Sequence, residues 1–137
     1  MDKRLLKEKA VRVASAFFTE RGIRSVKMDD IAMELSISKR TLYELFSDKE
    51  ELLLEVVKSH REEMKAFMTK EAERAGNVLE IIMAFYRKIS QNFKNANNGF
   101  FDEIKKYPRV TDLLEKGRKD NIEGAMKFYA KGVEQGS

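Results

Sequence analysis

A short stretch early in the chain gathers polar and cationic side chains that could contact nucleic acid. Ser38, Lys39, Arg40 and Thr41 follow one another at the start of an amphipathic segment, Lys39–Phe46. Lysine and arginine can donate to guanine O6 and N7 or to phosphate, and hydroxyl groups can bond phosphate. A helix N-terminus adds free backbone N–H groups that favour anions. These residue types in this order indicate contact with duplex DNA.

Two short amphipathic segments must position these side chains. Met28–Leu35 precedes Lys39–Phe46, and Ser36-Ile37-Ser38 separates them. Apolar residues recur at three-and-four spacing in both segments, as in helices with one buried face. Two short helices joined by three residues have the layout of a helix-turn-helix, in which the start of the second helix meets the major groove.

Three more residues extend the candidate interface. Tyr43 can place its hydroxyl group on a phosphate, and Lys49 lies at the start of the next helix, where free N–H groups also favour phosphate. Lys27 precedes the first of the two short helices and could make a charge contact. For each residue, the alternative interpretation is a solvated polar helix face. The predicted DNA contacts are Lys27, Ser38, Lys39, Arg40, Thr41, Tyr43 and Lys49.

Composition favours a binding protein over an enzyme. The 137 residues include 27 Lys and Arg against 23 Asp and Glu, a net charge of +4 that weakly favours an anionic partner. Cysteine is absent and His60 is the single histidine, so we predict no catalytic residue, no metal site and no cofactor. His60 is expected at the surface or at a domain junction. We predict no membrane segment and a cytoplasmic location, because no apolar stretch reaches about 18 residues.

The remaining sequence predicts helices and no strands. Gly22 is a plausible helix stop, and Gly76-Asn77 and Pro108 are further breaks. We therefore predict an all-α fold, with an N-terminal three-helix helix-turn-helix domain at residues 1–48 and a second helical domain at 49–137. The fourth helix is expected to bridge the two domains. Besides the two short helices, the expected helices cover about residues 3–21, 49–74, 78–94, 100–106 and 110–131.

Residues 5–58 resemble the DNA-binding domain of the TetR family of transcriptional regulators. The resemblance rests chiefly on Met28-Asp29-Asp30-Ile31-Ala32, Thr41-Leu42-Tyr43, Phe46 and Lys49-Glu50-Glu51-Leu52. It implies a ligand-responsive DNA-binding regulator, most often a repressor, that acts as a homodimer on a palindromic operator. The first alternative is an all-helical protein-interaction module without DNA binding, and the second is a small enzyme.

The sequence departs from the family pattern at three places. Val26-Lys27 stands where the family often has Thr or Ser, and Lys27 cannot cap a helix through its side chain. Arg40 replaces a residue that is usually small, which adds a candidate phosphate or base contact. Leu45 replaces a residue that is often aromatic or His, which puts that position in doubt as a base reader.

The resemblance also implies an effector-binding region in the second domain. Aromatic and methionine side chains there could line a cavity for a small apolar or aromatic molecule. For any single residue, the alternative is ordinary core packing. The predicted ligand contacts are Phe67, Met83, Tyr86, Phe100, Phe101, Tyr107 and Phe128.

The length of the chain bears on dimerisation. Members of the family usually end in two long helices that form the dimer interface, and this sequence stops about where those helices should begin. The expectation is therefore a fragment that lacks the C-terminal dimerisation helices. A homodimer is expected for the full-length protein and a weaker dimer for this chain.

Overall fold

The computed structural model of the chain describes residues 2–74, 76–92 and 100–134, and leaves out the side chains at positions 92, 100, 101, 121, 122 and 124–134. Within these ranges all regular structure is helical, so the predicted all-α fold is confirmed. The helices are α1 (Lys3–Arg21), α2 (Met28–Leu35), α3 (Lys39–Leu45), α4 (Lys49–Arg74), α5 (Val78–Asn92), α6 (Phe100–Ile104) and α7 (Pro108–Glu134).

The predicted helix ends need correction at four places, one of which is the end of α7, at Glu134 and three residues after the predicted end. Helix α3 ends one residue early, because Phe46 adopts an extended conformation. Helix α6 ends at Ile104. Helix α7 begins at Pro108, two residues before the predicted start. Proline lacks a backbone N–H, and the first turn of a helix needs none there. The predicted end of the fifth helix, at Lys94, lies outside the described residues.

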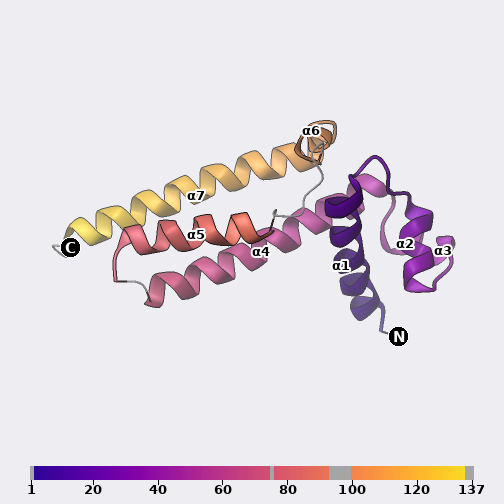
Figure 1. The fold of residues 1–137 in the computed structure, drawn as a ribbon, viewed down its shortest axis with the longest axis horizontal. Helices are drawn as coiled ribbons and strands as arrows, with labels where there is room; N and C mark the ends of the chain where they lie inside the picture. Colours follow the sequence, from indigo (N-terminus) through magenta and orange to yellow (C-terminus); the bar gives the residue numbers. More distant parts are fainter. Residues whose placement is uncertain (1, 75, 93–99, 135–137) are drawn as a thin grey trace.

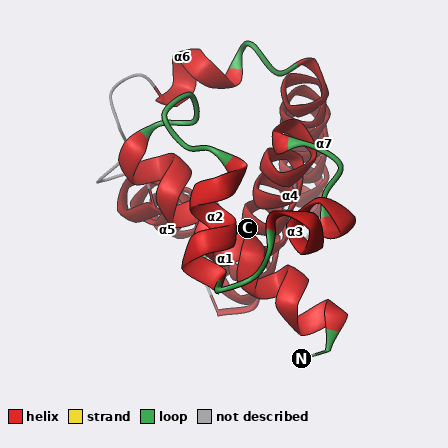
Figure 2. Cartoon of the chain, turned by 90° about the vertical axis from the view of Figure 1, so that its right-hand side faces the viewer, coloured by secondary structure: helices red, strands yellow, loops and turns green. Residues whose placement is uncertain are grey.

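The molecule is elongated, with α1, α2 and α3 gathered at one end (Figure 1). Helix α4 starts at that end and runs away from it, and α5 and α7 lie along it. Figure 2 views the molecule from the α1–α3 end, with α2 and α3 near the viewer and the long helices receding behind them. The helix-turn-helix therefore lies at the end of a helical bundle. We call this end, formed by α1, α2 and α3, the tip.

One hydrophobic core holds the tip together. Gly22 ends α1 as predicted: it has a φ of 86°, and its N–H donates to Phe18 O at 3.0 Å. Such a positive φ suits glycine, which has no Cβ to clash. The core also takes in side chains from the first turns of α4. Its fully buried large members include Phe18, Ile23, Val26, Ile31, Leu42, Phe46, Leu52, Leu53 and Val110.

Helix α4 contacts both ends of the molecule. Its first half packs in the core of the tip, down to Val57. Helix α4 also packs against α5 and α7. Helix α7 contacts it from its first turn, where Arg109 pairs with Glu50, to Arg61, whose Nη2 lies 3.6 Å from Asp120 Oδ2. The core thus extends beyond residue 48, and the domain boundary at that residue stays a prediction.

No helix within the described ranges combines the length and the apolar character needed to cross a membrane.

Candidate nucleic-acid interface

The turn between α2 and α3 is closed by local hydrogen bonds. Ser36 adopts a left-handed conformation with a φ of 56°, and its N–H donates to Met33 O at 3.1 Å. The N–H of Ile37 donates to Ala32 O at 3.0 Å. These two bonds form a Schellman motif, which satisfies carbonyl groups at the end of a helix. The motif fixes the direction in which the chain leaves α2 and enters α3.

Helix α3 is capped by Ser38 and held against the core by its apolar residues. The side chain of Ser38 accepts a hydrogen bond from the Thr41 N–H at 3.0 Å, which satisfies one free donor of the first turn. Leu42, Leu45 and Phe46 are buried against the core. Because these apolar side chains all point inward, the opposite face of α3 is turned outward.

Lys39 lies on the outward side of α3 and is paired with a carboxylate. Its Nζ is 3.0 Å from Oδ1 of Asp29, in the first turn of α2. The hydrogen bond to Asp29 and the charge of that carboxylate raise the pKa of Lys39. The ammonium group therefore stays charged at any physiological pH and can donate to DNA.

The other predicted contacts on α3 differ in exposure. Arg40 is exposed and lies 3.5 Å from Glu44 on the same helix. Tyr43 is 45% exposed. Thr41 is half-buried, and its hydroxyl lies 2.9 Å from that of Ser38. The structure thus brings the candidate contacts on α3 together at one outward-facing surface.

Lys27 and Lys49 flank this surface from neighbouring helices. Lys27 is exposed at the start of α2, and its backbone N–H donates to Asp30 Oδ2 at 2.9 Å. Lys49, at the start of α4, is half-buried. Burial lowers the pKa of Lys49, while the charges of Glu103 and Asp30 act in the opposite direction.

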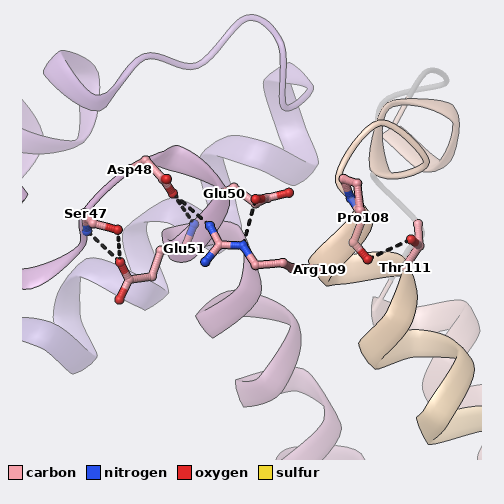
Figure 3. Close-up of polar contacts among 7 residues, drawn as sticks. All are labelled: Ser47, Asp48, Glu50, Glu51, Pro108, Arg109 and Thr111. Atoms are coloured by element: carbon pink, nitrogen blue, oxygen red, sulfur yellow. Dashed lines mark hydrogen bonds and ion pairs between the residues drawn. The ribbon is translucent and has the colours of Figure 1, made fainter.

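Charged side chains gather around the start of α4, and the contact that Arg109 makes with them was not predicted from the sequence (Figure 3). Asp48 Oδ1 accepts from the Glu51 N–H at 2.7 Å and so caps α4. Arg109, on α7, reaches both Asp48 and Glu50. The side chain of Glu51 accepts hydrogen bonds from the N–H and the hydroxyl of Ser47. No sequence pattern pairs Arg109 with residues this distant, so only the fold reveals this contact.

The predicted ligand contacts are not gathered around one described cavity. Met83 and Tyr86 are 53% and 74% exposed on α5, together with Leu79 and Ile82. Tyr107 packs against the core of the tip. The side chains of Phe100, Phe101 and Phe128 lie outside the described residues, so the ligand set stays a prediction.

Two small cavities are present among the described residues. The first, of about 300 Å³, is lined by Met83 and by four charged residues, Glu71, Arg74, Glu80 and Arg87. The second, of about 110 Å³, lies between α1 and α4, where His60 Nε2 is 2.8 Å from Ser15 Oγ. His60 is thus half-buried at the contact between the tip and the long helix. No group of side chains suited to bind a metal ion occurs within the described part of the chain.

The fold and the surface on α3 define an all-helical protein with an N-terminal helix-turn-helix. Residues 10–56 match the family described as "Bacterial regulatory proteins, tetR family". These residues therefore match the TetR family of transcriptional regulators, and the predicted resemblance is confirmed over this part of the chain.

Two proteins of Bacillus subtilis (strain 168) are similar to this chain. One is named as the uncharacterized HTH-type transcriptional regulator YvaF and is 35% identical over 108 residues, which cover 78% of this chain and 54% of that protein. The other is named as the uncharacterized HTH-type transcriptional regulator YezE and is 29% identical over 87 residues, which cover 64% of this chain and 43% of that protein. The chain thus spans about half the length of these curated relatives.

Proposed function

We propose that the protein regulates transcription by binding double-stranded DNA through α3. The observation that carries the proposal is the seating of this helix: Leu42 and Phe46 are fully buried, so the capped first turn faces outward with Lys39 and Arg40 exposed. A first turn with cations, hydroxyl groups and free N–H groups suits both base edges and phosphates in a major groove. A protein that acts on the bacterial chromosome in this way works in the cytoplasm.

The proposed DNA site is a palindromic operator bound by a homodimer. Two copies would place their α3 helices in successive major grooves, roughly 34–36 Å apart. The match of residues 10–56 to the TetR family supports this arrangement, because regulators of this family usually act as dimers.

The proposed regulation is repression that a small apolar or aromatic molecule relieves. The molecule would bind in the helical region after the tip and favour a different position of the tip. It lowers DNA affinity only by the difference between its affinities for the two positions. Helix α4 supports such coupling because it packs against α1 and also against α5 and α7.

DNA binding is tested first with the whole chain. Genomic fragments are selected on the immobilised protein, and the affinity for a selected duplex is measured at several salt concentrations. Affinity should fall steeply with salt, because each contacted phosphate releases counterions. The absence of salt-dependent binding would favour the alternative, a protein-interaction module.

Two matched variants then test whether the surface on α3 is the one that binds DNA. Lys39→Ala should weaken binding, whereas Lys70→Ala, which removes the same charge from the far half of α4, should leave it nearly unchanged. Equal losses from both variants would point to bulk charge and against α3 as the binding element.

A further inference from the structure

Asp29 is a carboxylate that directly contacts Lys39, the lysine that opens α3. It lies in the first turn of α2, and its Oδ1 is 3.0 Å from Nζ of Lys39 at the start of α3. The two side chains are 53% and 62% exposed, so the pair is open to an approaching ligand. Under the proposed function, DNA would meet Lys39 with this carboxylate already beside it.

Neighbouring carboxylates have other partners. Asp30 accepts a hydrogen bond from the backbone N–H of Lys27 at 2.9 Å, within the start of α2. Glu44 lies 3.5 Å from Arg40 on its own helix. Among the described ion pairs, the one with Asp29 is the pair that joins α2 to the first turn of α3.

The pair alters which DNA acceptors suit Lys39. An ammonium group has three N–H donors, so two remain after one is given to Asp29. Guanine O6 and N7 are neutral acceptors and can take these donors without repelling the carboxylate. A phosphate at the same place would bring a second negative charge close to Asp29. Like charges repel, and this repulsion would offset part of the attraction between Lys39 and the phosphate.

We propose that Asp29 is a specificity-determining residue, which directs Lys39 towards base edges and disfavours its use as a phosphate contact. Asp29 thereby lowers affinity for arbitrary DNA more than affinity for the preferred site. This inference rests on the proposed function, because it assumes that α3 binds DNA.

The test compares two charge removals on α2 in the whole chain. Asp29→Asn frees Lys39. Glu34→Gln is the control, since Glu34 is exposed on the same helix and no described cation pairs with it. The dissociation constant of each protein is measured for two duplexes over a range of salt. One duplex is selected from a random pool by the parent protein, and the other has the same bases in scrambled order.

The proposal predicts that only Asp29→Asn changes the ratio between the two dissociation constants. Asp29→Asn should tighten binding to the scrambled duplex by about two- to five-fold, the range expected from exposed ion pairs. Its salt slope on that duplex should steepen by about one, because Lys39 becomes a phosphate contact. The selected duplex should change less, so that the specificity ratio falls. Glu34→Gln should shift both duplexes by the same small factor, and in a Lys39→Gln background Asp29→Asn should leave the ratio unchanged.

The outcomes separate this inference from the proposed function. If the parent binds duplex DNA but Asp29→Asn shifts both duplexes equally, Asp29 acts only through bulk charge and the inference is overturned. If the parent shows no salt-dependent binding, the proposed function itself is wrong and the inference is overturned with it. Circular dichroism and thermal melting check the fold. Should Asp29→Asn unfold, Asp29→Ser removes the same charge with a residue that suits the start of a helix and takes its place.

Discussion

Arg109 Nε lies 2.7 Å from Glu50 Oε1, which ties the start of α7 to the start of α4 (Figure 3). Arg109 Nη2 also donates to Asp48 Oδ1 at 3.2 Å, the same oxygen that caps α4. Ile104 and Val110, on either side of the bend before α7, are buried in the core of the tip. Side chains from α6 and the start of α7 therefore hold in place the segment that carries Lys49, a proposed phosphate contact.

Arg109→Ala is expected to weaken the contact between the starts of α7 and α4 without unfolding the protein. The melting temperature should fall by about 1–4 °C, as for loss of partly exposed ion pairs, because the buried apolar contacts remain. The amide of Glu51 should exchange its hydrogen faster, since Asp48 loses a partner that holds it in place. Thermal melting and hydrogen exchange measure the two effects. Lys105→Ala is the control: it removes a cation that follows α6 and pairs with Asp102, and it should leave the Glu51 amide unchanged. Equal exchange in both variants would contradict the prediction.

Lys49→Ala is expected to weaken binding to all duplex sequences by about the same factor. Its proposed partner is phosphate, which carries no sequence information. The slope of log affinity against log salt should shrink by about one. The measurement is a salt titration on a selected and on a scrambled duplex, with Lys70→Ala as the control. An unchanged slope would remove Lys49 from the interface.

Lys39→Ala should change sequence preference as well as affinity. Lys39 opens α3 and is exposed, and a base contact discriminates by about 1–3 kcal/mol at one base pair in each half-site. Repeating the random-pool selection with the variant measures the preference directly. If variant and parent select the same sequences, Lys39 contacts phosphate and not a base.

Ser36→Gly is expected to stabilise the helix-turn-helix. Ser36 has a φ of 56°, a conformation that costs a residue with a side chain about 1–2 kcal/mol and costs glycine little. Glycine also adds freedom to the unfolded chain, so the net gain should be about 0.5–1 kcal/mol. Urea denaturation of parent and variant gives the value. Ser36→Val, which adds a branched side chain at the same angle, should be destabilising, and a stable Val variant would argue against the left-handed turn.

Glu51 should make the stability of the tip depend on acid pH. The hydrogen bonds from the hydroxyl and N–H of Ser47 lower the pKa of Glu51 below its ordinary value of 4.5. A carboxyl group whose pKa is lowered by folding contributes stability above its unfolded pKa, and the contribution is lost as pH falls through the folded pKa. Parent and Glu51→Gln should therefore differ in melting temperature at about pH 6, and the difference should shrink as the pH falls below 4.5 and through the lowered pKa of Glu51. A difference that is constant with pH would show that the hydrogen bonds do not depend on the charge.

Much of the tip could be predicted from local pattern. The apolar spacing of Met28–Leu35 and the polar break after it located α2 and the start of α3 correctly, because helix periodicity depends on near neighbours in sequence. Gly22 marked the end of α1 for an equally local reason, since its positive φ suits glycine. The end of α3 was missed by one residue, because Phe46 leaves the helix to enter the core.

The tertiary structure alone decided which distant side chains meet. Spacing within a helix predicts neighbours three and four positions apart, whereas the partners of Lys39 and Arg109 lie on other helices. Sequence placed Asp29 at the start of α2, but its contact with Lys39 depends on the angle between α2 and α3. In the same way, Glu103 acts on the pKa of Lys49 only because α6 packs at this end of the molecule, where Ile104 is buried in the core.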